Sequence, residues 1–543
     1  MSRTAAALRR EDGAPAPETV PPAPADAAGM IAARPLRLRD WIGVFAMVVG
    51  MFLAILDIQI VTSSLLQIQG GLSASADEIS WVQTAYLIAE VVMIPLSGTL
   101  SRLLSTRVLF TISAAGFTIT SALCASATSL GAMIVFRALQ GFIGGAMIPS
   151  VFPVIYTIFP RRQLAGVIVM VGLVLNLAPT IGPTVGGFLT DTYSWHWLFL
   201  VNIVPGTIVA IAVWFLIDVD KPDRSLLRYF DLPGLVLMAL FLGCLEYALE
   251  EGPRWDWFAD DTIVAAVAVS VIAAALFFWR VLSYRQPIVD LRTFADRNFA
   301  LGCFYTFVIG TGLYGATYVL PLFFAEVRGY SAMQIGTTVV VTGIAQLVIS
   351  PITGVLSRKL DPRLMLAIGM ALFAIAVYLT AGLTNQASFS ELLAPQALRG
   401  AALMFCFLPA NLLALGTLPP DKLKNAAGLY NLMRNLGGAI AIAVIGTVMN
   451  ARLHFHWNRL IESINPARPA VQRFLDMQSG RLDPHMAGDP DRGALKLLAN
   501  LVQREALVLT FNDVMLLLGS MFVIGLLLMP LVRRPRSAYG SVE

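Results

Sequence analysis

Charged residues are scarce in this sequence. Asp, Glu, Lys and Arg make up 13% of its 543 residues, whereas hydrophobic residues make up 57% and the mean hydropathy is +0.73. Such a composition excludes an ordinary soluble globular domain. The net charge is only +4, and the basic residues lie in short loops without interleaved aromatic residues, so we expect no nucleic-acid partner.

The motifs of common enzymes and metal sites are missing as well. The sequence has no Walker A loop, no GxSxG, no HExxH and no kinase motif, so it predicts neither an enzyme nor ATP as the energy source. The four cysteines lie inside apolar stretches without CxxC spacing, and His454 and His456 have no further ligands nearby. We therefore expect no metal and no cofactor.

Long apolar stretches are what the sequence has instead. About 20 apolar residues cross a bilayer, and this length predicts fourteen membrane helices. They cover approximately residues 41–66, 79–100, 107–127, 130–157, 163–189, 197–218, 232–250, 261–283, 298–324, 332–356, 364–383, 394–417, 425–449 and 507–531. Most of the 38 Lys and Arg then fall on one side, and only Arg254 and Arg328 fall in short loops on the other. By the positive-inside rule, both termini are cytoplasmic.

A repeat divides the spans into two related halves. Residues 95–107 read PLSGTLSRLLSTR and residues 351–363 read PITGVLSRKLDPR, with seven identical positions. The spacing is far too long for a solenoid, and it is typical of a membrane transporter whose related halves rock around a central site. Because the copies end the second and tenth spans, the first six spans correspond to the ninth to fourteenth. The seventh and eighth spans are therefore an inserted pair between two six-helix bundles. The same alignment pairs Glu90 with Gln346.

This organisation predicts five segments. The Ala- and Pro-rich start of the chain has no apolar core before a cleavage site, so we interpret it as a disordered cytoplasmic tail and not as a signal peptide. The segments are the tail (1–40), an N-terminal six-helix bundle (41–218), the inserted pair with its linkers (219–297), a C-terminal six-helix bundle (298–532) and a second cytoplasmic tail (533–543). Within the last bundle, the polar segment 450–506 faces outward and either docks a partner or caps the last loop.

A few charged residues lie inside the predicted spans. Each costs roughly 2.5–3.5 kcal/mol on insertion scales, which makes it a candidate functional residue. They are Asp57, Glu90, Arg137, Glu246, Arg399 and Arg434. The three arginines also suit a structural role, tying helices together. Glu246 belongs to the inserted pair, which can lie outside the transport path, and we expect its neighbours Glu250 and Glu251 at the water interface.

The depths of three of these residues can be estimated. At 1.5 Å per residue, Asp57 lies about 24 Å from the cytoplasmic start of its helix, and Arg137 lies about 10 Å below the external start of its own. An ion pair between them is therefore feasible. Glu90 lies near the midplane, where burial disfavours the charged carboxylate and allows reversible protonation. We therefore expect Asp57 and Glu90, with Arg137, to couple transport to protons.

The span 163–189 contains the stretch Gly182-Pro183-Thr184-Val185-Gly186-Gly187. Glycines allow neighbouring helices to approach closely, and a proline inside a helix removes a hydrogen bond and bends it. The stretch predicts a kinked, close-packed hinge. Packing alone is the alternative, because Gly and Pro are common in membrane helices.

These motifs resemble those of one known family. The GPxxGG stretch at 182–187 resembles the antiporter motif of drug–proton antiporters in the major facilitator superfamily, and Arg137-Ala-Leu-Gln140-Gly141 resembles the RxxQG motif of the same superfamily. With fourteen spans, the chain resembles the EmrB/QacA-like group over residues 40–532 or so. One departure is Arg102, which stands where the loop motif of the superfamily usually has Asp.

The resemblance implies an all-α major facilitator fold, with two six-helix bundles and an inserted helix pair. It also implies an inner-membrane antiporter that exports hydrophobic or amphipathic compounds in exchange for protons, with a periplasmic adaptor and an outer-membrane channel as partners. We expect the cavity wall to include Gln59, Tyr86, Asn176, Tyr314, Gln346 and Arg399. The alternatives are a proton-coupled transporter of one metabolite class, such as a siderophore or fatty acid, and a membrane sensor or scaffold.

Overall fold

The computed structural model describes residues 36–75, 77–284, 286–330, 332–387, 389–465, 467–482 and 489–532. Within these residues every regular element is a helix, and 14 helical segments are long and apolar enough to cross a membrane. The predicted number of spans is therefore confirmed. The two predicted tails lie outside the described residues, apart from residues 36–40 at the start of the first span.

The spans follow one another along the chain in the predicted order. Those of the first half are α1 (Leu38–Thr62), α3 (Trp81–Leu104), α4 (Thr106–Ala125), α5 with α6 (Leu130–Gly144 and Met147–Ile158), α7 (Arg161–Thr192) and α8 with α9 (Trp197–Leu200 and Ile203–Leu216). The inserted pair is α10 (Leu232–Glu251) and α11 (Asp261–Ser283). Those of the second half are α12 (Arg297–Glu326), α13 (Ala332–Leu356), α14 (Pro362–Thr380), α15 (Phe389–Leu415), α16 (Pro420–Glu462) and α18 (Pro490–Leu527). Two shorter helices outside the spans are α2 (Leu65–Leu72) and α17 (Pro469–Leu482).

Two of the spans are interrupted by a short break. In each, a proline follows four residues after the break, since Pro149 follows Gly145 and Pro205 follows Val201. A proline has no N–H to donate to the carbonyl four residues earlier. That missing hydrogen bond accounts for the separation of α5 from α6 and of α8 from α9.

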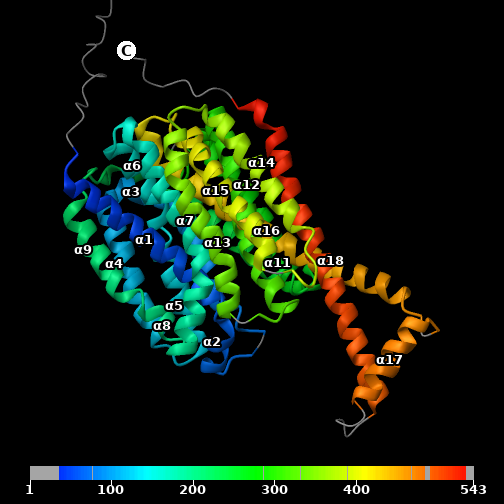
Figure 1. Ribbon diagram of the computed structural model, residues 1–543. Coiled ribbons are helices and arrows are strands. Elements are labelled where there is room, and N and C mark those ends of the chain that lie inside the picture. The colour runs from blue at the N-terminus through cyan, green and yellow to red at the C-terminus, as the bar shows by residue number, and fades with distance from the viewer. Residues whose placement is uncertain are drawn as a thin grey trace, which may run out of the picture.

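The two ends of the described chain lie at the same end of the helix bundle, at the top of Figure 1. We call this end the terminal side and the opposite end the stalk side. Buried apolar side chains form two clusters, one centred on α1 to α9 and the other on α12 to α18. The main contacts between these halves are those of α7 with α13 and of α3 with α16.

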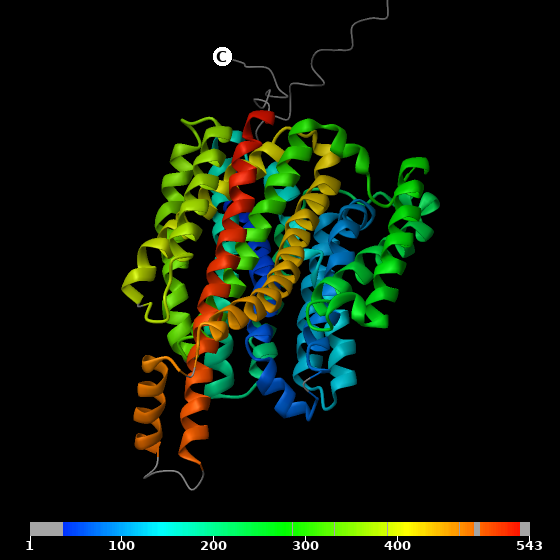
Figure 2. The same cartoon turned by 90° about the vertical axis from the view of Figure 1, so that its right-hand side faces the viewer.

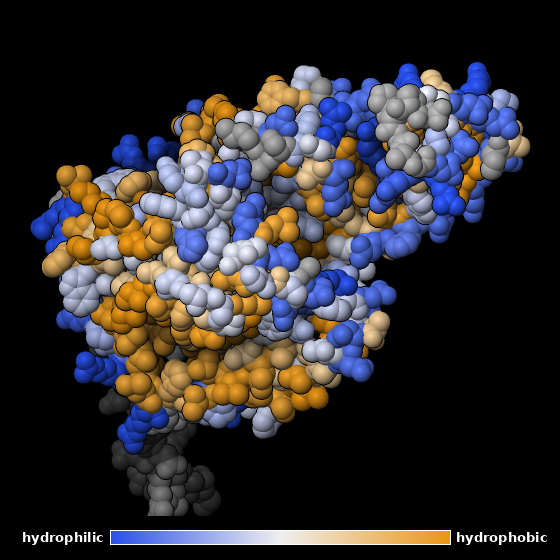
Figure 3. Space-filling view, turned by 90° about the horizontal axis from the view of Figure 1, so that it is seen from below, coloured by the Kyte–Doolittle hydropathy of each residue, from blue (hydrophilic) through white to orange (hydrophobic). Residues whose placement is uncertain are grey.

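The polar segment 450–506 is mainly helical where it is described. α16 continues to Glu462 without a glycine or proline to end it after residue 449, and α18 begins at Pro490, so both are far longer than the predicted spans 425–449 and 507–531. With α17 they project from one corner of the bundle (Figures 1 and 2). We call the described part of 450–506 the stalk. Its surface is largely hydrophilic in the view from the stalk side (Figure 3).

The inserted pair lies beside α3, and Figure 2 shows it at the flank of the bundle. α10 packs on α3, where the rings of Tyr247 and Trp81 stack with their centroids 5.3 Å apart. Beyond the end of α10, the indole N–H of Trp257 donates to the Thr447 hydroxyl of α16 at 2.7 Å. The pair therefore contacts both halves of the protein on the stalk side.

Candidate functional site

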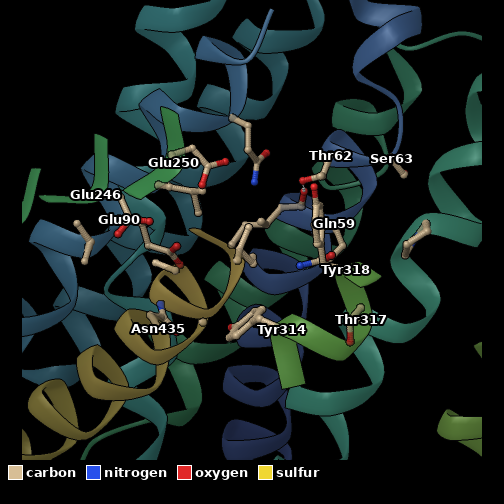
Figure 4. Close-up of a pocket in the computed structure, with 18 of the residues that line it drawn as sticks. Gln59, Thr62, Ser63, Glu90, Glu246, Glu250, Tyr314, Thr317, Tyr318 and Asn435 are labelled. Atoms are coloured by element: carbon tan, nitrogen blue, oxygen red, sulfur yellow. Dashed lines mark hydrogen bonds between the residues drawn. The ribbon is translucent and has the colours of Figure 1, made fainter. Parts of the chain in front are cut away.

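A cavity of about 280 Å³ lies between the two halves. Its lining comes from α1, α3, α7, α10, α12 and α16, from the middle of these helices toward the stalk side. Figure 4 shows polar side chains on two opposing walls of this space. The inserted pair supplies part of one wall through α10, so it belongs to the site and does not lie outside it.

Three carboxylates form one wall of the cavity. Glu90 comes from α3, and Glu246 and Glu250 come from successive turns of α10. Glu90 is only 2% exposed and Glu246 only 6%. The buried Glu90 Oε1 has no hydrogen-bond partner in the described part of the chain. Glu246 interacts electrostatically with both of the other two (Figure 4).

The prediction for the end of α10 was wrong. Glu251, expected at the water interface, is 3% exposed and accepts hydrogen bonds from Thr84 at 3.3 Å and from the Trp255 indole at 3.2 Å. Glu250 is half-buried and lines the cavity. The signal that could have identified it is its spacing of four residues from Glu246, which places both on one face of a helix.

The facing wall is formed by amide, hydroxyl and aromatic groups. Gln59 and Thr62 come from α1, and Tyr314 and Tyr318 come from α12 (Figure 4). Gln59 and Tyr314 are two of the six residues predicted for the cavity wall. Tyr318, one helical turn from Tyr314 on the same face, was missed although its spacing indicated it.

The other four predicted wall residues do not line this cavity. Tyr86 is fully buried, and its ring lies under an arginine, with the guanidinium carbon 4.3 Å from the ring centroid. Asn176 donates to a carbonyl of its own helix at 2.8 Å, and Arg399 donates to a threonine hydroxyl of α13 at 2.9 Å. Gln346 is fully buried. All four are buried away from the lining of this cavity, and residue type alone does not reveal which face of a helix meets the cavity.

The predicted ion pair between Asp57 and Arg137 is present. The Arg137 Nη1 atom lies 2.5 Å from Asp57 Oδ2, and neither side chain has exposed surface. Gln140 and Asn202 donate to the other carboxylate oxygen at 3.2 and 2.8 Å, and Arg137 also donates to Gln140 at 2.7 Å. Gln140 is the second polar residue of the RxxQG motif, so this motif builds the network that holds Asp57.

Another buried arginine, Arg434, lies next to the cavity-lining residue Asn435. Arg434 is 2% exposed. It interacts electrostatically with Glu90 and with Tyr314. Arg434 lies well inside α16, which begins at Pro420. Proline suits the first turn of a helix, where its missing N–H has no partner to lose.

The GPxxGG stretch packs α7 directly against α1. A Cβ atom at Gly182 would lie 2.3 Å from the Cβ of Gln59, and one at Gly186 would lie 2.8 Å from the carbonyl oxygen of Ile60. Pro183 lines the cavity. α7 is a single helix through both of its prolines. The motif therefore brings α7 and α1 into close contact at the edge of the site.

The terminal side of the protein is closed. Lys424, near the start of α16, forms an ion pair with Asp220 and donates to the carbonyl of Ser101 at 3.1 Å. Farther across the boundary, the Tyr156 hydroxyl donates to the Asn411 side chain at 2.8 Å. These contacts join the two halves between the cavity and the terminal side, so the cavity is separated from that side.

The two copies of the sequence repeat differ in their surroundings. A Cβ atom at Gly98 would lie 2.9 Å from the Cα of Asn425, so the first copy lets α3 and α16 approach closely. In the second copy, a Cβ atom at Gly354 would meet only Val169, at 3.8 Å. Arg102, the departure from the usual motif, donates to Thr99 within its own helix at 3.2 Å.

Comparisons with known proteins agree with this architecture. The family model of the Major Facilitator Superfamily matches residues 47–442. The chain is 41% identical to the colistin resistance protein EmrB of Acinetobacter baumannii, over 90% of this chain and 95% of that protein. It is 29% identical to the multidrug export protein EmrB of Escherichia coli K12, over 91% and 96% of the two chains.

Solved structures show the same fold at low sequence similarity. The human organic anion transporter MFSD10 superposes with a TM-score of 0.54 at 13% identity, covering 89% of this chain and 99% of that one. The sequence motifs, the two halves around a cavity and the EmrB relatives agree with one another. The chain belongs to the Major Facilitator Superfamily and, within it, to the EmrB-like multidrug efflux transporters.

Proposed function

We propose that this protein exchanges protons for hydrophobic or amphipathic compounds and exports them across the inner membrane. The observation that supports the exchange is Glu90, a buried carboxylate at the cavity with one oxygen lacking a partner. A charged carboxylate without a partner is unfavourable in low dielectric, so the group gains from binding either a proton or a polar group of a substrate.

The proposed orientation follows from the distribution of charge. The short loops rich in Lys and Arg lie on the terminal side, which is therefore cytoplasmic by the positive-inside rule. The stalk then lies outside. In this orientation the protein is closed toward the cytoplasm, and the cavity is on the side from which protons enter and where substrates leave.

Asp57 and Arg137 complete the proposed proton-coupling group. Both interact electrostatically with Glu90. The two form a buried pair in the same half as Glu90, whereas Arg434, which also interacts with Glu90, belongs to the second half. Rocking of the halves therefore changes the distance between Arg434 and Glu90. Alternating access thereby favours proton binding at Glu90 in one state and release in the other.

The test uses purified protein in vesicles with an imposed proton gradient. Glu90→Gln should abolish gradient-driven substrate accumulation, because the amide cannot bind and release a proton. It should leave exchange of substrate without a gradient intact. Glu391→Gln, an exposed glutamate at the start of α15, is the matched control. Full gradient-driven transport by Glu90→Gln would overturn the assignment.

The stalk is the proposed docking site for a periplasmic adaptor that leads to an outer-membrane channel. Its hydrophilic helices project well beyond the bundle and have no part in the cavity. Replacing residues 463–489 by a short flexible linker should abolish drug resistance in cells but leave vesicle transport unchanged. Unchanged resistance would exclude the adaptor role, and a parallel loss of vesicle transport would assign the stalk to the transport cycle itself.

A further inference from the structure

The inserted helix α10 gives the cavity a strongly acidic wall. Glu246 and Glu250 are four residues apart, so their side chains lie on one face of α10, about 6 Å apart along its axis. Like charges at this spacing destabilise a helix. Glu90 of α3 adds a third carboxylate, and electrostatic interaction joins Glu246 to both of the others. None of the residues that line the described cavity is a Lys, Arg or His.

Neighbouring cations do not neutralise this wall. Arg434 and Arg137 interact with Glu90 alone of the three, and Arg137 is also paired with Asp57. No residue in the described part of the chain forms an ion pair with Glu246 or Glu250. The buried Glu90 Oε1 is likewise without a hydrogen-bond partner and lies at the cavity. Glu246 and Glu250 therefore face the cavity without a cation partner in the described part of the chain, and Glu90 faces it with Arg434 and Arg137 nearby.

The opposite wall suits the apolar part of a ligand. Tyr314 and Tyr318 present aromatic rings, and Pro321 of the same helix adds aliphatic surface. In Figure 4, Tyr318 lies across the cavity from Glu246 and Glu250. A positive group near carboxylates gains Coulomb energy in a low-dielectric site, and tyrosine faces also attract cations.

We propose that α10 makes this transporter selective for amphipathic organic cations, with Glu246 and Glu250 receiving the positive group and Tyr314 and Tyr318 packing on the apolar part. The inserted pair thus determines which substrate charge the cavity prefers, in addition to covering the flank of the bundle. This inference rests on the proposed export of amphipathic compounds, but it concerns recognition and does not require proton coupling.

The test measures binding to the purified full-length protein in detergent, without any gradient. The probes are tetraphenylphosphonium as the cation and laurate as the anion. The Glu246→Gln and Glu250→Gln variants should each raise the Kd for tetraphenylphosphonium about ten-fold, equivalent to about 1.4 kcal/mol. Their Kd for laurate should be unchanged or lower, which also shows that they are folded. Glu391→Gln should bind both probes like the wild type.

Two results would overturn the proposal. One is unchanged binding of tetraphenylphosphonium in both variants, and the other is an equal loss of both probes. Failure of proton coupling would leave a different signature. In that case tetraphenylphosphonium binds and responds to the two substitutions, whereas a gradient drives no accumulation in vesicles.

Discussion

Arg137 Nη1 lies 2.5 Å from Asp57 Oδ2 with no exposed surface on either side chain. Removing one member of a buried pair leaves the other charge uncompensated, which costs about 3–5 kcal/mol. Asp57→Asn should therefore destabilise the purified protein strongly, as measured by the temperature of half-unfolding in detergent. The double variant Asp57→Asn/Arg137→Gln should recover part of that loss. A single variant as stable as the wild type would contradict this account of the network.

The ion pair between Lys424 and Asp220 should stabilise the form closed on the terminal side. A partly buried pair contributes about 1 kcal/mol, so Lys424→Met should raise the population opened on that side roughly five-fold. A cysteine introduced at the buried Ser97, in a background without the native cysteines, would report opening by its rate of alkylation. Lys422→Met, an exposed lysine of the same helix turn, is the control. Equal alkylation rates in both variants would show that the Lys424–Asp220 ion pair does not stabilise the closed form.

The antiporter stretch offers a matched pair of glycine substitutions within α7. A methyl group at Gly186 would meet the Ile60 carbonyl at 2.8 Å, whereas a methyl group at Gly166 would meet nothing within 4 Å. Gly186→Ala should therefore destabilise the protein by about 1–3 kcal/mol through overpacking and slow vesicle transport. Gly166→Ala should do neither. Comparable thermal stability and transport in the two variants would exclude a close-packing role for this position.

Trp257 ties the inserted pair to α16 through its hydrogen bond to Thr447. Trp257→Phe keeps an aromatic ring and removes the donor, so the loss is that of one hydrogen bond, about 1 kcal/mol. We expect faster hydrogen exchange in the segment after α10, without a change in the exchange of α3. Trp255→Phe, which removes a donor to Glu251 instead, serves as the comparison. An unaltered rate of hydrogen exchange after α10 in Trp257→Phe would contradict a stabilising role for the hydrogen bond between Trp257 and Thr447.

The ion pair could be predicted from the sequence because it depends on few variables. The rise per residue of a helix is fixed, and the bilayer aligns the helices, so depth alone brought Asp57 and Arg137 to one level. The GPxxGG contact was predictable for a similar reason, since residues 182–187 leave α7 with almost no side-chain bulk on the face that meets α1.

Which residues line the cavity depends on how each helix is rotated about its own axis. The depth of a residue in the membrane does not determine this rotation. Tyr86 and Gln346 have suitable chemistry and depth but face their neighbours. The spacing of Glu250 from Glu246 indicates that they share a face of α10, but only the docking of α10 on α3 through Tyr247 and Trp81 determines that this face meets the cavity. Such docking results from packing between segments about 165 residues apart, and no local pattern in the sequence encodes it.

The length of α16 and α18 has a mechanical consequence. The part of α18 beyond the membrane extends about 25 Å at 1.5 Å per residue, so a tilt of about 10° within the bilayer moves its far end by about 4 Å. Because both helices continue unbroken from the transport core into the stalk, a small tilt in the core during each transport cycle becomes a larger displacement at the far end of the stalk. A partner bound to the far end of the stalk would move with each conformational change at the cavity. By reciprocity, its binding would shift the conformational equilibrium of the cavity.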